Sequence, residues 1–231
     1  MKVLLFDIDG TLVNTGGTGK DAMNQAFEEI FGVPNGLDGI LLAGQTDPKI
    51  MLDVFQKLGM KWDDRKIEEF KERYYLRLSE EFQRPRASRR LMPGFPEALE
   101  KLSKLTKTHL GLLTGNWKRG AEIKLENFGL WKFFEFGAFG DDDLDRNKLV
   151  PHAIHRAANI FGSHPQSDRV YVIGDTPRDV QCARPHGATA IAVATGDYSV
   201  EVLRAEKPDY LFADFSNVDT FLRIFTNEHP A

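Results

Sequence analysis

Short apolar runs recur along the chain and alternate with longer amphipathic segments. The runs are rich in β-branched residues and bounded by turn residues, which predicts buried parallel strands. They lie at 3–6, 110–113, 170–173 and 190–193, with a weaker one at 210–212. Helical spacing in the segments between them predicts an α/β fold, a Rossmann-like three-layer core with a parallel sheet. In such sheets, ligands bind beyond the carboxyl ends of the strands.

One stretch breaks this alternation. Between residues 15 and 86 there is no convincing strand pattern, and apolar residues instead repeat at helical spacing in three successive segments. We therefore predict an inserted, all-helical cap domain at 15–86, with a catalytic core formed by residues 1–14 and 87–231. The returning segment QRPRASRRLMPG, residues 83–94, is rich in arginine and proline, as expected of a linker.

Composition narrows the classes of protein to consider. The 231 residues are 42% hydrophobic and 28% charged, which predicts a globular chain with one substantial core and a smaller unit. Cys182 is the only cysteine, which excludes an intrachain disulfide and favours a cytoplasmic location. The net charge of −4 favours neither nucleic acid nor an anionic membrane as a partner. No apolar run has the length needed to span a bilayer.

Two carboxylates directly follow the first predicted strand, in the sequence DIDGT of residues 7–11. Because the chain leaves the strand here, Asp7 and Asp9 can face the same cavity. Gly10 permits a tight turn that directs backbone N–H groups inward, and Thr11 adds a hydroxyl. Aspartate and glycine also occur in ordinary turns, but this combination directly after a buried strand favours a functional site.

A second acidic pair occurs in GDTPRD, residues 174–179, directly after the run at 170–173. Asp175 and Asp179 are four residues apart and would share one face of the following helix. A capping role would explain Asp175 but gives no reason for a second carboxylate at that spacing. Carboxylates gathered at one sheet edge repel one another, so a cation is required there. Oxygen ligands without a Cys/His cluster favour Mg²⁺.

Two weaker signals concern phosphate binding. In LLTGN, Thr114, Gly115 and Asn116 directly follow the run at 110–113 and precede a predicted helix. A hydroxyl and free N–H groups at a helix N-terminus suit a phosphate oxygen, although these residues are also common caps. Lys148, in RNKLVP, precedes the helix that leads to the GDTPRD strand, and only this position makes it a candidate.

Together, DIDGT, Thr114, Lys148 and GDTPRD, in this order along the chain, resemble the four motifs of the haloacid dehalogenase superfamily. The resemblance covers essentially the whole chain, and the helical stretch is similar to that family's cap. LAGQTDPKI, residues 42–50, is similar to a cap segment of the phosphoglycolate phosphatase-like subgroup. The resemblance implies a Mg²⁺-dependent phosphatase that acts on a small-molecule phosphate ester.

The resemblance also implies a role for each site residue. Asp7 would be the nucleophile that forms an aspartyl-phosphate, Asp9 the general acid and base, and Thr114 a phosphate-binding group. Lys148 would neutralise phosphoryl charge, but Pro151 follows it by three positions rather than one, which leaves Lys132 and Lys124 as alternatives. The other implied substrate-binding residues are Gly10, Thr11, Gly115 and Asn116. The implied metal-binding residues are Asp7, Asp9 through its carbonyl, Asp175 and Asp179.

Several alternatives stay open. A β-phosphoglucomutase-like phosphotransferase shares every core motif. A receiver-type phosphoacceptor also gathers acids, a threonine and a lysine at a sheet edge, but it lacks a large helical insertion and a general acid beside the acceptor. Asp9 argues against a dehalogenase or a phosphonatase, which lack this acid. Phosphoglycolate, sugar phosphates, nucleotides and pyrophosphate all remain candidate substrates, and the protein is expected to be a monomer or a homodimer.

Overall fold

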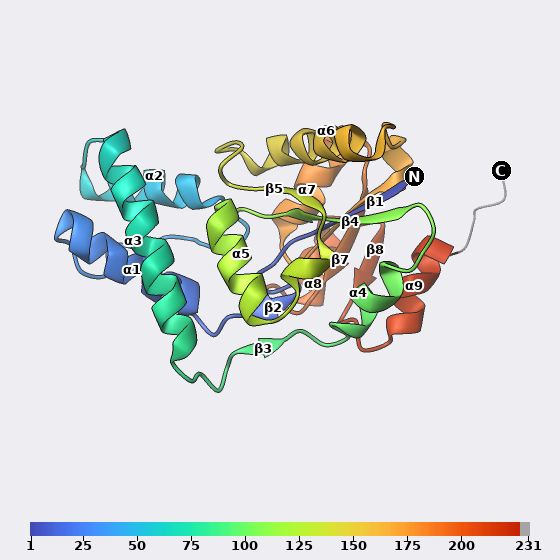
Figure 1. The fold of residues 1–231 in the computed structure, drawn as a ribbon, viewed down its shortest axis with the longest axis horizontal. Coiled ribbons are helices and arrows are strands. Elements are labelled where there is room, and N and C mark those ends of the chain that lie inside the picture. The colour runs from blue at the N-terminus through green and yellow to red at the C-terminus, as the bar shows by residue number, and fades with distance from the viewer. Residues whose placement is uncertain (227–231) are drawn as a thin grey trace.

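A six-stranded parallel sheet forms the centre of the computed structural model, which describes residues 1–226 (Figure 1). The strand order is β5-β4-β1-β6-β7-β8, and every neighbouring pair is parallel. The strands are β1 (Lys2–Phe6), β4 (Thr108–Leu113), β5 (Phe136–Ala138), β6 (Val170–Gly174), β7 (Thr189–Val193) and β8 (Tyr210–Phe212). All five predicted strands are present, and β5 was not predicted.

Helices cover both faces of the sheet and complete three layers. One face carries α4 (Glu97–Leu102), α5 (Lys118–Asn127) and α9 (Val218–Thr226), and the other carries α6 (Leu149–Phe161), α7 (Pro177–Ala183) and α8 (Val200–Ala205). Along β1, Leu4 and Phe6 belong to the first hydrophobic cluster, whereas Val3 and Leu5 belong to the second. Successive side chains of a strand point to opposite faces, so β1 is buried on both. The predicted three-layer α/β fold is confirmed.

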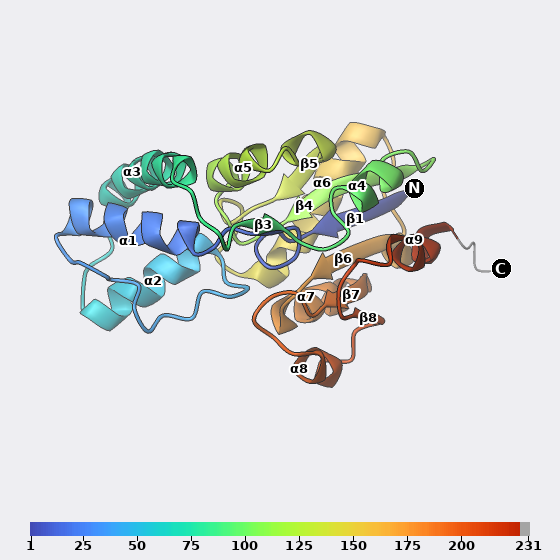
Figure 2. The same cartoon turned by 90° about the horizontal axis from the view of Figure 1, so that it is seen from below.

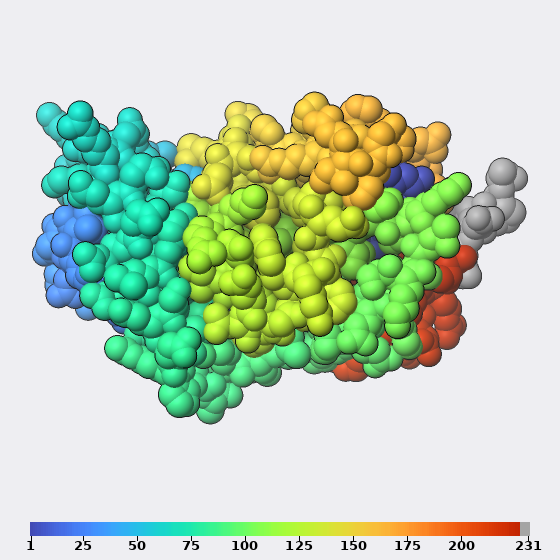
Figure 3. Space-filling model, in the orientation of Figure 1, coloured from blue at the N-terminus to red at the C-terminus, as the bar shows by residue number. Residues whose placement is uncertain are grey.

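Three helices between β2 (Val13–Asn14) and β3 (Arg90–Leu91) form a separate bundle, which we call the helical insertion. They are α1 (Thr18–Phe31), α2 (Asp47–Leu58) and α3 (Asp64–Gln83). Its own core contains Phe27, Phe55 and Phe70, with Phe27 edge-on to both of the others. Trp117, at the start of α5, also packs in this core. Figure 2 shows the insertion beyond one end of the sheet, and in Figure 3 its surface continues into that of α5.

The two connections to the helical insertion lie side by side. Strands β2 (Val13–Asn14) and β3 (Arg90–Leu91) pair in an antiparallel ribbon, with Val13 opposite Leu91 and Asn14 opposite Arg90. These two-residue strands leave no periodic pattern in the sequence. Within residues 1–226, no helix combines the length and the apolar character needed to cross a membrane.

Candidate active site

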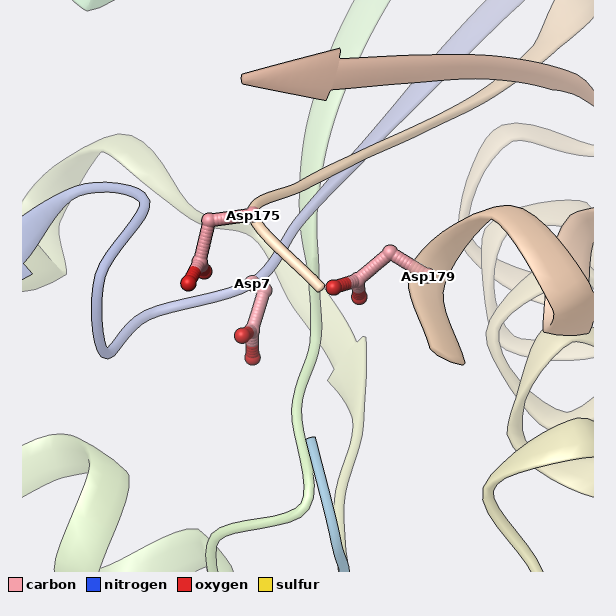
Figure 4. A group of neighbouring side chains, drawn as sticks. All are labelled: Asp7, Asp175 and Asp179. Atoms are coloured by element: carbon pink, nitrogen blue, oxygen red, sulfur yellow. The ribbon is translucent and has the colours of Figure 1, made fainter. Parts of the chain in front are cut away.

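Three buried carboxylates meet at the carboxyl edge of the sheet (Figure 4). Asp7 follows β1, Asp175 follows β6, and Asp179 lies in the first turn of α7. Because β1 and β6 are neighbouring parallel strands, their ends lie together. One oxygen from each side chain lies within 4.8 Å of one from the other two. We call this group the carboxylate cluster.

Local contacts hold each member of the carboxylate cluster. Asp175 accepts a hydrogen bond from the Thr11 hydroxyl at 2.7 Å. A Cβ atom at Gly196 would overlap the Asp175 carboxylate, so this close approach requires glycine. Asp179 accepts from the backbone N–H of Thr176 at 3.0 Å and from its hydroxyl at 2.8 Å, in a capping box. Asp179 therefore also has a capping role, which the sequence pattern alone did not indicate.

A buried arginine compensates part of the negative charge. Arg146 lies in the 3₁₀ turn η2 (Arg146–Lys148), and its Nη2 atom is 3.2 Å from Asp7 Oδ1 and 2.5 Å from Asp179 Oδ1. Its side chain is only 6% exposed. Sequence reasoning missed Arg146, because the sequence does not show which residue of the RNK turn faces inward.

The three candidate lysines lie in different places. The Lys148 side chain is 65% exposed and pairs with Asp143 at 3.4 Å, so the structure does not bring it to the carboxylate cluster. Lys132 lies in the 3₁₀ turn η1 (Trp131–Phe133), with its Nζ 5.2 Å from the Phe133 ring centroid. Lys124, on α5, is buried and lines the same cavity as Asp7. Arg146 and Lys124 are therefore the buried cations of this site.

Lys124, Asp9 and Asn116 form a hydrogen-bonded triangle. Asp9 Oδ2 accepts from Lys124 Nζ at 2.6 Å and from Asn116 Nδ2 at 2.9 Å, and Lys124 also donates to Asn116 Oδ1 at 2.7 Å. Asn116 Nδ2 further donates to the Thr114 hydroxyl at 2.7 Å. The Asp9 side chain is thus held apart from the carboxylate cluster, in an orientation set by its two partners.

A cavity of about 410 Å³ lies between these strand ends and the helical insertion. This volume is in the range of small-molecule sites. It is lined by the predicted residues Asp7, Asp9, Gly10, Thr114, Gly115, Asn116 and Asp175. The cavity is not lined by Thr11, Asp179 or Lys148. Thr11 nevertheless donates a hydrogen bond to Asp175, and Asp179 pairs with Arg146. Most of the predicted site residues therefore line one cavity.

The start of α2 closes one side of this cavity. Asp47 donates its backbone N–H to the Gly115 carbonyl at 2.7 Å, and its Oδ2 accepts from the backbone N–H of Trp117 at 2.8 Å. The Thr46 hydroxyl donates to the Leu144 carbonyl at 2.7 Å. A Cβ atom on Gly115 would overlap the backbone at 45–46, so only glycine permits this approach. The sequence indicated the 42–50 segment but not the role of Asp47.

Burial changes the protonation of these acids. Loss of solvation raises the pKa of Asp7 to about 6, with Arg146 opposing the shift and Asp179 adding to it. Burial, followed by the charges of Asp7 and Asp179, raises the pKa of Asp175 well above its ordinary value. Burial also raises the pKa of Asp47 to about 7, opposed by Lys124. Without a bound metal ion, these carboxyl groups therefore keep a proton to higher pH than an exposed aspartate does.

We expect the metal-free protein to lose thermal stability as pH rises from about 5.5 to about 7, the range in which Asp7 and Asp47 titrate. A carboxyl group whose pKa is higher in the folded chain than in the unfolded chain takes up a proton on folding. The free energy of unfolding therefore decreases as pH rises from the unfolded-state pKa to the folded-state pKa. Melting in EDTA should show a decrease of roughly 5–10 °C. Asp47→Asn should make the dependence shallower. A melting temperature that increases with pH across this window would contradict these shifts.

The donor set of the carboxylate cluster fits Mg²⁺. Its ligands are carboxylate oxygens, which Mg²⁺ prefers, and the described part of the chain adds no histidine or cysteine to the cluster. Arg146 supplies one positive charge against three carboxylates, so a divalent ion would relieve the remaining repulsion. The residues that would hold it are Asp7 and Asp175, with Asp179 behind them.

Comparisons with known proteins test the expected family and fold. A family model described as haloacid dehalogenase-like hydrolase matches residues 4–193. The chain belongs to this family. This haloacid dehalogenase-like hydrolase is 25% identical to a pyrophosphatase PpaX of Oceanobacillus iheyensis, over 96% of the chain and 97% of the relative. It is also 25% identical to a phosphoglycolate phosphatase of Pasteurella multocida, over 96% and 98% of the two chains.

A solved structure shares the fold of this haloacid dehalogenase-like hydrolase along nearly its whole length. A hydrolase from Pseudomonas syringae superposes with a TM-score of 0.71 at 21% identity, covering 98% of this chain and 100% of the other. At this level of identity, the likeness supports the fold alone. The family and the α/β fold expected from the sequence motifs are confirmed.

Proposed function

We propose that this protein is a Mg²⁺-dependent phosphatase that hydrolyses a small phosphate ester through an aspartyl-phosphate on Asp7. The observation that carries the proposal is the position of Asp7: a buried carboxylate at a strand end, beside Arg146 and Asp175, that lines a cavity shared with Asp9. The names of the relatives, a pyrophosphatase and a phosphoglycolate phosphatase, support phosphate chemistry.

In the first step, an Asp7 oxygen attacks phosphorus, and the bond between phosphorus and the leaving oxygen breaks. Asp9 donates a proton to that oxygen, so the leaving group departs as an alcohol. In the second step, Asp9 removes a proton from water, which attacks phosphorus and frees Asp7 and inorganic phosphate. Mg²⁺, when bound at the carboxylate cluster, would offset the negative charge of the phosphoryl oxygens.

Neighbouring residues hold these two aspartates in position. Arg146 holds Asp7 in place and limits the repulsion between Asp7 and Asp179. Lys124 and Asn116 fix the orientation of Asp9, while the Thr114 hydroxyl lines the cavity, where it can bind a phosphoryl oxygen. We further propose that residues 15–86 act as a cap that excludes bulk water from the cavity.

The metal requirement provides a direct test. We expect inorganic phosphate release from small phosphomonoesters in Mg²⁺, and a loss of more than ~100-fold in excess EDTA that added Mg²⁺ reverses. Asp175→Ala should raise the Mg²⁺ concentration for half-maximal activity roughly tenfold or more, because it removes an oxygen ligand. Asp197→Ala is the matched control, since Asp197 lines the cavity but is exposed and outside the carboxylate cluster.

Three outcomes would contradict parts of this proposal. Unchanged hydrolysis in EDTA would remove the metal from the mechanism. Accumulation of a bisphosphate in place of free phosphate would indicate a phosphotransferase. Failure to release phosphate from any ester, with a phosphorylated chain that persists for minutes, would favour a phosphoacceptor without turnover.

A further inference from the structure

The loop between β4 and α5 carries two residues of the site. Thr114 lines the cavity, and the Asn116 side chain donates to Asp9 at 2.9 Å and to the Thr114 hydroxyl at 2.7 Å. The Asn116 carbonyl accepts from the Gly140 N–H at 2.8 Å. Because Asn116 helps to set the orientation of Asp9, a shift of this loop would also move the Asp9 carboxylate.

Asp47, the first residue of α2, holds this loop on either side of Asn116. Its backbone N–H donates to the Gly115 carbonyl at 2.7 Å, and its Oδ2 accepts from the Trp117 N–H at 2.8 Å. Asp47 and Trp117 are 5% and 3% exposed, so water competes little for the second bond. Asn116 therefore lies between two anchors that one residue of the helical insertion provides.

The second anchor also satisfies the start of α5. Backbone N–H groups at a helix N-terminus have no partner within the helix. Trp117 is the N-cap residue of α5, and its side chain forms no capping hydrogen bond. Its N–H is bonded to Asp47 instead, and the next one, of Lys118, to Asp141 at 2.5 Å. Loss of the Asp47 carboxylate would leave the buried Trp117 N–H unpaired, which favours a shift of the loop.

The Trp117 side chain attaches the same loop to the core of the helical insertion. Its ring centroid lies 6.1 Å from that of Phe70 and 6.1 Å from that of Tyr74. Aromatic packing of this kind holds the loop in place but tolerates small rotations, whereas hydrogen bonds depend steeply on direction. The two bonds of Asp47 are therefore suited to set the backbone orientation at 115–117.

We propose that Asp47 is a positioning residue, which keeps the loop on either side of Asn116 in place and thereby keeps Asp9 oriented. This inference rests on the proposed phosphatase function and adds a residue of the helical insertion to those that align the reacting groups. Burial raises the pKa of Asp47 to about 7, so near neutral pH the group is partly protonated. Its oxygen can accept the bond from the Trp117 N–H in either form, so the acceptor matters more than the charge.

Two substitutions separate the acceptor from the charge. Asp47→Ala removes the acceptor, so kcat for phosphate release should fall about tenfold or more, while KM stays within about threefold. Asp47→Asn places an amide oxygen at the same position and should keep kcat within about threefold of the unmodified protein. Steady-state rates of the Mg²⁺-loaded full chain, with the ester that it hydrolyses fastest, measure both effects.

Thr46→Val is the matched control. The Thr46 hydroxyl donates to the Leu144 carbonyl at 2.7 Å, so this substitution also breaks a hydrogen bond between the helical insertion and the rest of the chain, one residue earlier. It leaves the bonds to the loop at 115–117 in place and should change kcat by less than about threefold. Asp47→Ser, whose hydroxyl is one bond nearer the backbone, is a second variant without the acceptor, for use if Asp47→Ala does not fold.

Amide hydrogen exchange tests the contact without reference to activity. The Trp117 N–H should exchange at similar rates in the unmodified protein, Asp47→Asn and Thr46→Val. It should exchange at least about tenfold faster in Asp47→Ala and Asp47→Ser, because its acceptor is missing. Residue-resolved exchange on the full chain, well below the melting temperature of each variant, measures this difference.

A double-mutant cycle tests whether Asp47 acts through Asn116. If it does, Asp47→Ala should lower kcat less than about threefold in a chain that already carries Asn116→Ala, since the side chain to be positioned is absent. Independent losses that multiply would overturn the proposed route.

The remaining outcomes separate this inference from the proposed function. Hydrolysis that is unaffected by Asp47→Ala, or affected in KM alone, would overturn the inference and leave the phosphatase function standing. An equal loss of kcat in Asp47→Asn or in Thr46→Val would overturn it as well, because the charge or a general loosening of the helical insertion would then explain the effect. Absence of phosphate release from every ester would overturn both proposals.

Discussion

Replacement of Asp7 by asparagine is expected to lower phosphate release by at least ~1,000-fold. The amide has nearly the size of the carboxylate but is a poor nucleophile, so the reaction loses its first step. The fold should persist, because the substitution removes one of three mutually repelling carboxylates without leaving a void. Initial rates with the preferred ester and thermal melting of both proteins measure these two effects.

A covalent adduct provides a second readout for the same variant. Acid quenching during turnover should trap a phosphorylated chain with the unmodified protein and none with Asp7→Asn, as detected by intact-protein mass. Asp197→Asn, at an exposed position lining the same cavity, is the matched control and should retain full activity. If Asp7→Asn retained a tenth of the original rate, another residue would have to be the nucleophile.

Arg146→Ala is expected to be the second most damaging substitution. The change would leave Asp7 and Asp179 buried without their counter-ion, and loss of one partner from such a group destabilises proteins by about 3–5 kcal/mol. It should also lower kcat about 100-fold or more, because Asp7 is no longer held in place. Urea unfolding and steady-state rates measure the two effects separately.

Lys148→Ala is the matched control for Arg146→Ala. The two residues belong to the same 3₁₀ turn, but Lys148 is exposed and pairs with Asp143 at the surface. Its removal should change stability by less than ~1 kcal/mol and the rate by less than about twofold. A larger loss of activity from Lys148→Ala than from Arg146→Ala would restore the role that the sequence motif first suggested for the lysine.

The fold was predictable where burial leaves a strong pattern. A strand such as β1 is covered on both faces, so it appears in the sequence as a continuous apolar run. The edge strand β5 was missed because its three residues include Gly137, which is unfavourable in strands. The β2–β3 ribbon was missed because two residues per strand are too few for periodicity to show.

The site was predictable where sheet geometry determines it. Asp7 and Asp175 lie at the ends of neighbouring parallel strands, so the pairing of the strands brings them together regardless of the loop conformations. Arg146 could not be assigned from sequence, because its importance depends on contacts between distant segments. Its side chain reaches Asp7 and Asp179 from a short 3₁₀ turn, and the sequence does not show which residue of that turn faces inward.

The paired β2 and β3 strands have a consequence for how this architecture can change over evolution. Since Asn14 lies opposite Arg90, all residues between them could be replaced by a tight hairpin turn without moving either end. A recombination event at this single position could therefore remove, acquire or exchange the whole bundle. The aspartates of the carboxylate cluster would keep their places, because the elements that carry them lie outside the exchanged segment.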